Sequence, residues 1–526
     1  MKDATQNLPK SVEELNALIE QKEAIIEKKN AEIERLQEQV TFLNFQLYGR
    51  KSEKSLKENS NQLSFFDLPE NPLEDESIET ETVNIPEHIR RKKGRRKLPE
   101  NLPRIDVIHD ISEEEKRCAC GHQMNRFGED VSEKLDIIPA KIRVIRHIRP
   151  KYACKNCEGL EDDGPTIKIA APPPQIIEKG LASPSLLAYC LVSKFCDALP
   201  FYRQEIIFKR IGIDIPRQTM CNWTIKTAEK CEPLAELLLE EIRSGPLIHI
   251  DETNVQVLKE PGRKATTKSY MWAIRGGQKD NPIILYHYHQ SRGANVVKNL
   301  LEGFKGMVMS DGYAAYDFLD DVPGIIHLGC MAHARRKFTD CRTSGQGGRS
   351  KTAETAIKIF EKLYRIEKSA SINELDFAEI KNLRTEKSRP LMNKLKNFLM
   401  GKMDHVPPKS LSGKAIHYAL KQWARFERYL EYGRAPIDNN LVENAIRPFV
   451  VGRKNWLFSG TPEGAKASSL FYSLIETAKA NQLEPFSYLK FLFEKIPVTT
   501  DSDFQILLPN RVKAEDIDNV KGSRAV

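Results

Sequence analysis

The spacing of apolar residues near the N-terminus predicts a long helix that pairs with another helix. Apolar residues recur at alternating intervals of three and four, and Glu, Lys, Gln and Asn fill most of the intervals. The seam positions are Val12, Leu15, Ile19, Lys22, Ile26, Lys29, Ile33, Leu36, Val40, Leu43 and Leu47. Such a heptad seam stabilises a helix by packing against a second seam. We therefore predict a dimerising coiled coil over residues 1–50; one amphipathic helix packed on its own chain is the alternative.

Short apolar runs typical of buried strands appear after residue 246. They cover residues 247–253, 270–275, 283–288, 306–310 and 325–329, and a helical pattern at 294–301 follows the third run. Three strands, a helix, and then alternating strands and helices is the order of a ribonuclease-H-like α/β domain. In that arrangement the first and fourth strands are neighbours.

The remaining domain boundaries follow from changes in the same pattern. Residues 246–333 and 434–460 are predicted to form the ribonuclease-H-like core, and residues 334–433, which are helical and charged, a helical insertion within it. Residues 461–526 are predicted to be a C-terminal helical segment and tail. Residues 176–245 are predicted to be helical, and the segment 201–223 has the helix, short turn, helix pattern of a DNA-reading motif, although most helical hairpins do not read DNA.

Three carboxylates are the candidate catalytic residues. The first apolar run leads into Asp251, Asp311 directly follows the fourth run, and Glu443 lies on a later helix, where it shares a face with Asn440 and Arg447. Two close carboxylates repel each other unless a cation lies between them. Carboxylate oxygens suit Mg²⁺, and two such ions can stabilise both the attacking and the leaving oxygen of a phosphoryl transfer. We therefore predict that these three acids hold two Mg²⁺ (or Mn²⁺) ions.

Each of these acids also has a purely structural alternative. Asp251 could cap the turn after its strand, and Asp311 with Gly312 is an ordinary turn pair. Asn440 with Glu443 fits a helix-capping pattern. The metal interpretation depends on all three acids meeting in one place.

A dense run of positive charge precedes the cysteines. Residues 51–100 are predicted to be a flexible linker that ends in this run, formed by Arg90, Arg91, Lys92, Lys93, Arg95, Arg96 and Lys97. Such a run attracts DNA phosphates, and the alternative is a solvated charge run. Arg447, Arg453 and Lys454, near the third acid, are further candidates for DNA contact.

Two close cysteine pairs predict a small zinc-ribbon-like β domain over residues 101–175. Cys118 and Cys120 form the first pair, and Cys154 and Cys157 the second, with an alternating, strand-like stretch at 141–149 between them. The first pair is one residue short of the usual spacing, so His122 could replace a cysteine. Four buried or free thiols are the alternative to one structural Zn²⁺.

The composition of the chain narrows the possible classes of protein but does not identify a function. The chain has 526 residues, 40% of them hydrophobic, and a formal net charge of +8. This mildly basic balance permits nucleic-acid binding without demanding it. Because no apolar run approaches the length of a membrane helix and the N-terminus has no apolar signal region, a cytoplasmic protein is expected.

Taken together, these residues resemble the transposases of the insertion sequence 66 group. The resemblance rests on the zipper-like start, the cysteine pairs, and the segments 47–54, 128–133, 146–154, 191–195, 249–253, 310–313, 439–443 and 452–456. It implies a DDE transposase in which Asp251, Asp311 and Glu443 are the three acids and a helical insertion precedes the third. Cys330 and His333 resemble a short element of such enzymes, for which packing or positioning is expected rather than metal binding.

The resemblance implies DNA cleavage at the ends of a mobile element, followed by attack of the freed 3′-hydroxyl on target DNA. The expected partners are double-stranded DNA, a second copy of the chain, and accessory proteins of the same element. Two other classes stay open: a DNA-binding regulator without catalysis, and a ribonuclease-H-like nuclease that only cleaves. The chain has no phosphate-loop motif.

Overall fold

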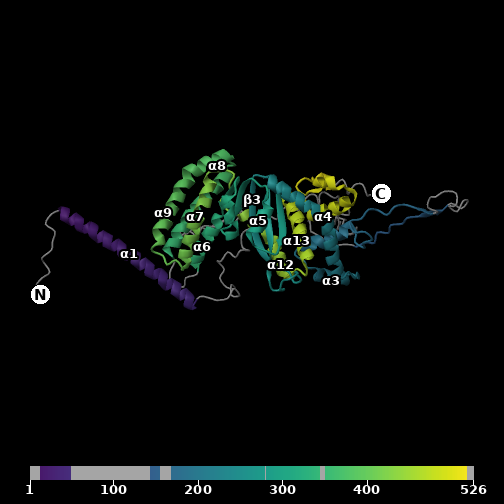
Figure 1. Ribbon diagram of the computed structural model, residues 1–526, viewed down its shortest axis with the longest axis horizontal. Coiled ribbons are helices and arrows are strands. Elements are labelled where there is room, and N and C mark those ends of the chain that lie inside the picture. Colours follow the sequence, from purple (N-terminus) through teal and green to yellow (C-terminus); the bar gives the residue numbers. More distant parts are fainter. Residues whose placement is uncertain (1–11, 49–141, 154–166, 279, 344–349, 518–526) are drawn as a thin grey trace, which may run out of the picture. The chain divides into compact units, whose positions relative to one another are not determined.

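The computed structural model describes residues 12–48, 142–153, 167–278, 280–343 and 350–517 (Figure 1). It divides into two units: one contains the N-terminal helix and the chain from Pro173 onward, and the other contains residues 142–172 as far as they are described. The predicted linker with its basic run and all four cysteines of the predicted zinc site lie outside the described residues. None of the described helices is long and apolar enough to cross a membrane.

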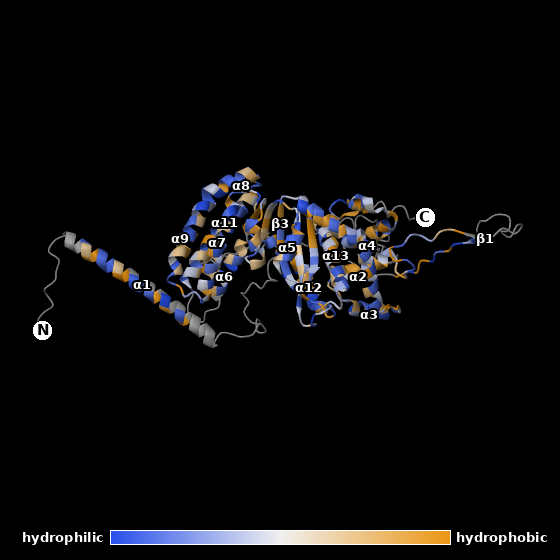
Figure 2. Ribbon diagram, in the orientation of Figure 1, coloured by the Kyte–Doolittle hydropathy of each residue, from blue (hydrophilic) through white to orange (hydrophobic). Residues whose placement is uncertain are grey.

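The predicted N-terminal helix is confirmed as α1 (Val12–Tyr48). Hydrophobic and hydrophilic residues alternate along it (Figure 2). Two seam residues, Ile26 and Ile33, are 57% and 51% exposed. Because the structure contains one chain, pairing of two such helices stays a prediction.

The second unit contains a short hairpin of β1 (Lys151–Ala153) and β2 (Ile167–Ile169), which pair antiparallel. The predicted strand at 141–149 is wrong over residues 142–149, which have no regular structure. Val144 and Ile148 in that segment are 89% and 75% exposed. Among the described residues no strand pairs with this segment and none buries its apolar side, and a strand without a partner is not stable in water.

A five-stranded mixed sheet lies at the centre of the first unit, in the order β5-β4-β3-β6-β7. Its strands are β3 (Leu247–Gln256), β4 (Lys268–Gln278), β5 (Asn281–His289), β6 (Gly306–Ser310) and β7 (Ile325–Gly329). The first three pair antiparallel, whereas β6 lies parallel to β3 and β7 lies parallel to β6. All five predicted strands are confirmed, as is the helix α5 (Ala294–Leu300); a 3-10 helix, η1 (Ala314–Asp321), precedes β7.

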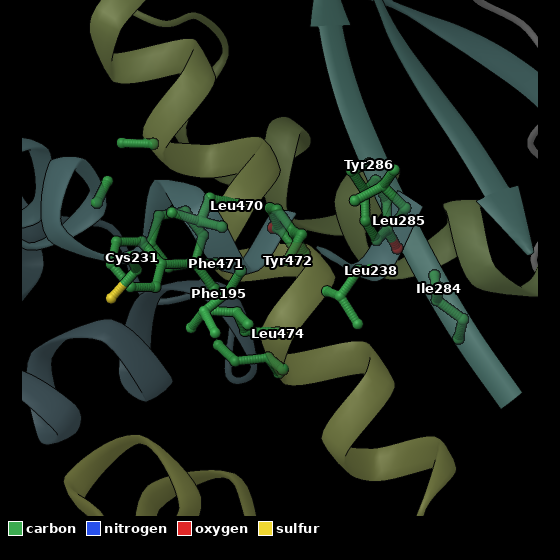
Figure 3. Packing of buried hydrophobic residues seen from close by; sticks show 14 of the residues in the cluster. Phe195, Cys231, Leu238, Ile284, Leu285, Tyr286, Leu470, Phe471, Tyr472 and Leu474 are labelled. Carbon is green, nitrogen blue, oxygen red and sulfur yellow. The ribbon is translucent and has the colours of Figure 1, made fainter. Parts of the chain in front are cut away.

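Helices from both ends of the sequence form the larger hydrophobic core with the sheet. They are α2 (Pro184–Phe195), α3 (Phe201–Arg210), α4 (Arg217–Ser244), α12 (Asn440–Trp456), α13 (Pro462–Ala480) and α14 (Pro485–Lys495), followed by η4 (Ile496–Val498) and η5 (Asp501–Leu507). Phe195, Leu238, Tyr286 and Phe471 meet in this core (Figure 3). The predicted helix, turn, helix is present as α3 and α4, but α4 continues for 28 residues and buries its later turns.

The segment between β7 and α12 is helical, as predicted, and has its own core. Its elements are α6 (Met331–Thr343), α7 (Lys351–Ile372), α8 (Phe377–Leu383), the π-helix η2 (Arg384–Ser388), α9 (Arg389–Met403), α10 (Leu411–Lys421), α11 (Trp423–Glu427) and η3 (Arg428–Leu430). Together they form the green bundle in Figure 1. Met309 and Leu328 from the sheet belong to this second core, which therefore anchors the bundle on β6 and β7.

One helix covers the open edge of the sheet. Because β5 is an edge strand, its outward backbone groups need partners from outside the sheet. Helix α13 supplies hydroxyls one turn apart: Thr477 Oγ1 accepts from the Ile284 N–H at 3.0 Å and donates to the Ile284 carbonyl at 2.9 Å, and Ser473 Oγ accepts from the Tyr286 N–H at 2.8 Å.

Replacing Thr477 by valine is expected to lower the free energy of unfolding by about 1–3 kcal/mol, because both backbone groups of Ile284 would be buried without a partner. Thr355→Val is the matched control, since the Thr355 hydroxyl bonds only to a carbonyl of its own helix. Chemical denaturation of both variants measures the difference. Equal losses would mean that the α13 hydroxyls do not stabilise the sheet edge.

Candidate active site

Two of the predicted acids lie on neighbouring parallel strands. The register pairs Ile248 with Val308 and His249 with Met309, so Asp251 on β3 and Asp311, just after β6, continue the same alignment. Asp251 does not end its strand as predicted: β3 runs five residues further, and Asp251 pairs with Ala273 of β4. The turn-cap alternative for Asp251 is therefore wrong. Asp311 does make the turn contact that was its alternative, because its Oδ1 accepts from the Tyr313 N–H at 2.9 Å.

The third acid comes from the first turn of α12, which lies against β3 and β4. Glu443 is buried, with 4% of its surface exposed. The capping alternative for Asn440 and Glu443 is wrong, because the helix is capped at Asn439 and the Asn440 side chain instead donates to Asp438 Oδ2 at 2.9 Å.

The electrostatics of Asp251 show that the acids are close together. Burial raises the pKa of Asp251 well above its usual value, and the neighbouring negative charges of Glu252, Asp311 and Glu443 raise it further. One hydrogen bond, from the Glu252 N–H to Asp251 Oδ1 at 2.9 Å, opposes this shift. Repulsion of this kind costs stability in the absence of a counter-charge.

Asn439 ties together the segments that carry these acids. It is fully buried, and its amide donates to the Ile250 carbonyl at 3.0 Å while its Oδ1 lies 2.8 Å from His249 Nδ1. Because the amide oxygen can only accept, His249 donates from Nδ1; burial lowers the pKa of His249 to about 4, so the ring is neutral. The Asn439 backbone N–H contacts Cys330 Sγ at 3.2 Å. The sequence analysis singled out Asn440 and missed Asn439.

An ion pair between a buried carboxylate, Glu252, and a half-buried arginine, Arg292, was also missed. Glu252 points to the opposite side of β3 from Asp251, where it receives hydrogen bonds from Arg292 Nε and from the Tyr316 hydroxyl. The Arg292 guanidinium lies 3.7 Å above the Tyr313 ring. This network fixes the strand that carries Asp251 against the turn that carries Asp311.

Helix α6 contributes a histidine and an arginine to the surroundings of Glu443. His333 Nδ1 lies 3.5 Å from Glu443 Oε1, and Arg336 donates to Glu443 Oε2 at 3.1 Å. Cys330, His333 and Glu443 place ligand atoms within 4.8 Å of one another. The sequence analysis linked Cys330 with His333 but not with Glu443, because Glu443 lies more than a hundred residues further along the chain.

The residues present fit a hard divalent cation better than a soft one. Carboxylate oxygens are the ligands that Mg²⁺ prefers, and Glu443 Oε1 is buried with no hydrogen-bond partner among the described residues. Cys330 is a poor partner for Mg²⁺, since burial raises the pKa of its thiol and keeps it protonated.

The helical bundle reaches the same site. A side chain at Gly312, next to Asp311, would stand 2.6 Å from the Tyr418 ring and 2.9 Å from Gln422 Nε2, so α10 and its C-cap close over this turn. Of the predicted DNA-binding residues near Glu443, Arg447 is half-buried and Lys454 is exposed. Arg453 instead bonds Thr253 Oγ1 at 3.1 Å and Asn254 Oδ1 at 2.7 Å, which holds the end of α12 to β3.

Comparison with known protein families shows which family this chain belongs to. The model described as "Transposase IS66 family" matches residues 179–467, which is more than half of the chain and contains all three acids. The chain belongs to this family. It is therefore related to transposases, enzymes that act on DNA. Three further models of the family match: a zinc-finger binding domain of transposase IS66 at residues 115–158, the C-terminal element at 473–509, and "Transposase C of IS166 homeodomain" at 35–107.

Individual relatives of this family member cover most of its length. A protein of Sinorhizobium fredii named "Uncharacterized protein y4qI" is 34% identical over 89% of this chain and 87% of its own length. A second protein of that organism, "Uncharacterized protein y4jD", is 32% identical over 97% of this chain and 98% of its own. The similarity to the second protein thus extends over nearly the whole chain.

Proposed function

We propose that this protein is a DDE transposase that cleaves DNA at the ends of an insertion sequence and joins the freed ends to target DNA. The observation that carries the proposal is the convergence of Asp251, Asp311 and Glu443 on two neighbouring strands and one helix. The strand order β5-β4-β3-β6-β7, with an antiparallel meander followed by two parallel strands, supports a ribonuclease-H-like core for this site. A DNA-binding regulator without catalysis would not need all three acids, whereas such an enzyme needs each of them.

In the proposed mechanism the three carboxylates would hold two Mg²⁺ or Mn²⁺ ions, which would supply charge stabilisation for the attacking and leaving oxygens. Asp251 and Asp311 are kept in line by the parallel pairing of β3 with β6, and Asn439 holds α12 and Glu443 against β3. A water oxygen attacks the phosphorus, the P–O3′ bond breaks, and the departing 3′ oxygen takes up a proton. That 3′-hydroxyl then attacks a target phosphodiester and displaces its 3′ oxygen.

A strand-transfer assay tests this proposal. Labelled duplexes that carry the element end are incubated with the full chain and Mg²⁺, either intact or already cut to expose the 3′-hydroxyl. We expect cleavage of the first and joining of the second, and loss of both activities in Asp311→Asn and Glu443→Gln. Cleavage without joining would identify a nuclease, and DNA binding without either reaction would identify a regulator.

DNA binding is proposed to involve the basic run at residues 90–97 and the exposed Lys454, with Arg447 beside the third acid. Seven positive charges in eight residues would neutralise phosphates in any sequence, so this segment would add affinity rather than specificity. The helix, turn, helix of α3 and α4 is the candidate for reading the terminal repeats, in the bacterial cytosol where the element resides.

Dimerisation through α1 is proposed because its seam residues are exposed and spaced for pairing. Replacing both Ile26 and Ile33 by glutamate is expected to convert a dimer to a monomer at micromolar concentration, because a coiled-coil seam does not bury unpaired carboxylates. Gln21→Glu with Lys28→Glu is the matched control, since these positions have the same separation but lie off the seam. Sedimentation analysis distinguishes the two; a seam variant that stays dimeric would place the interface elsewhere.

A structural Zn²⁺ held by Cys118, Cys120, Cys154 and Cys157 is proposed because all four cysteines fall inside the zinc-finger match at 115–158. One equivalent of zinc per chain is expected by elemental analysis, and Cys154→Ser should release it. Cys231→Ser, at a buried cysteine of the other unit, should keep the metal. A chain that retains zinc without Cys154 would have a different ligand set.

A further inference from the structure

One arginine of the helical bundle is paired with the third of the three acids. Arg336, on the second turn of α6, donates from Nη2 to Glu443 Oε2 at 3.1 Å. The Glu443 carboxylate is buried, whereas the Arg336 side chain is 45% exposed. Among the described residues, no other arginine or lysine lies within ion-pair distance of Glu443, Asp251 or Asp311. In that part of the chain, Arg336 therefore supplies the positive charge nearest to the acids.

The second neighbour of Glu443 on α6 supplies no positive charge. His333 Nδ1 lies 3.5 Å from Glu443 Oε1. Burial lowers the pKa of His333 below its usual value, so the ring is neutral at pH 7. Glu443 Oε1 is buried and has no hydrogen-bond partner among the described residues. One oxygen of this carboxylate is thus paired with a cation, while the other accepts no hydrogen bond from that part of the chain.

A divalent ion at the acids would change the role of Arg336. A buried carboxylate oxygen without a donor costs free energy, and an ion bound between the acids would remove that cost. The same ion would repel the guanidinium that already contacts Glu443, since both are positive and would share one carboxylate. Arg336 has a long side chain that is half-exposed, so its guanidinium can turn into solvent while α6 stays in place.

We propose that Arg336 is a positioning residue that holds the Glu443 carboxylate in the metal-free protein and releases it to the divalent ion. The ion pair neutralises one acid of a cluster whose charges repel one another, and it keeps the Glu443 side chain in one orientation. Metal binding requires this ion pair to open, so Arg336 competes with the metal. This inference rests on the proposed function, because it assumes that the three acids bind a divalent ion.

Metal binding and thermal unfolding of the full chain test the inference without DNA or catalysis. Arg336→Gln is expected to lower the melting temperature of the metal-free protein by a few degrees, because a buried carboxylate loses its counter-charge. The same variant should bind Mn²⁺ about 10-fold more tightly than the parent, because no ion pair has to open first. At saturating Mn²⁺ its melting temperature should equal that of the parent. The electron paramagnetic resonance signal of free Mn²⁺ measures the affinity.

Three further variants separate this role from a merely structural one. Arg335→Gln is the matched control, since it removes the next arginine of α6, which is exposed and lies over the Tyr364 ring instead of at Glu443. It should leave the Mn²⁺ affinity unchanged. Arg336→Lys keeps the charge and should stay close to the parent in both measurements. In a chain that already carries Glu443→Gln, Arg336→Gln should no longer lower the melting temperature.

Two results would overturn the role of Arg336 and leave the proposed function standing. One is Mn²⁺ binding that is unchanged or weaker in Arg336→Gln. The other is a loss of melting temperature that persists at saturating Mn²⁺ or in the Glu443→Gln chain, because a purely structural contact would behave in this way. A parent chain whose Mn²⁺ affinity is the same with and without Glu443→Gln would instead overturn the proposed metal site, and the inference with it.

Discussion

Replacing Asp251 by asparagine is expected to lower strand cleavage by at least about 10³-fold while raising the thermal stability of the metal-free protein. The activity would fall because one of the proposed ligands of the divalent ions is lost, and several kcal/mol of charge stabilisation at the phosphate would be lost with it. The stability rises because Asp251 is partly buried beside three other acids that repel its charge. Asparagine keeps the shape of the side chain and removes that repulsion.

The pH dependence of the stability change follows from the sign of the pKa shift. Because the pKa of Asp251 is higher in the folded than in the unfolded protein, the folded state binds the proton more tightly and loses stability as pH rises above the usual aspartate range. The stabilising effect of Asp251→Asn should therefore be larger at neutral than at acidic pH. Added Mg²⁺ should stabilise the parent protein, more so at higher pH, and should not stabilise the variant.

Thermal unfolding with and without Mg²⁺, combined with a cleavage assay, measures all of these effects. Asp321→Asn is the control, because Asp321 is an exposed acid at the end of η1 and lies outside the cluster. A variant at Asp251 that unfolds at lower temperature than the parent and no longer binds DNA would show that Asp251 has a structural role instead.

Much of the domain that carries the three acids was predictable, because the sequence of each strand favours a strand by itself. Apolar runs such as 306–310 form buried strands wherever a sheet can accept them, and the acid that follows the run marks the strand end. The extension of β3 past Asp251 was not predictable, since it depends on pairing with β4 over the same residues. The wrongly predicted strand at 142–149 shows the converse: its residues alternate as a strand requires, but no partner in the described part of the chain buries them.

The residues that assemble the site were harder to predict than the acids themselves. Glu252 bonds Arg292 and Tyr316, which are 40 and 64 residues away, and nothing in the local spacing links them. Arg453 was expected to contact DNA, yet its guanidinium is used to hold β3. Long-range hydrogen bonds leave no periodic signal in a single sequence. Charge and apolar spacing therefore identify the candidate catalytic residues, but not the residues that hold them in place.

Asn439 is the strongest case, and its replacement by alanine is expected to lower the free energy of unfolding by roughly 2–5 kcal/mol. The substitution leaves the Ile250 carbonyl and His249 Nδ1 without partners in a fully buried position, and each orphaned group costs about 1–3 kcal/mol. Cleavage should fall as well, because Asn439 is the contact that fixes the start of α12, and with it Glu443, against the strand of Asp251.

The neighbouring asparagine offers a matched control. Asn440→Ala removes only a bond to Asp438, on a half-buried side chain, and should cost about 1 kcal/mol or less. Denaturant unfolding ranks the two variants, and cleavage measured at a temperature where both are fully folded separates a displaced Glu443 from a merely unstable protein. If Asn439→Ala keeps full cleavage while folded, β3 and α12 hold the acids together without it, and the assembly of the site depends on helix packing alone.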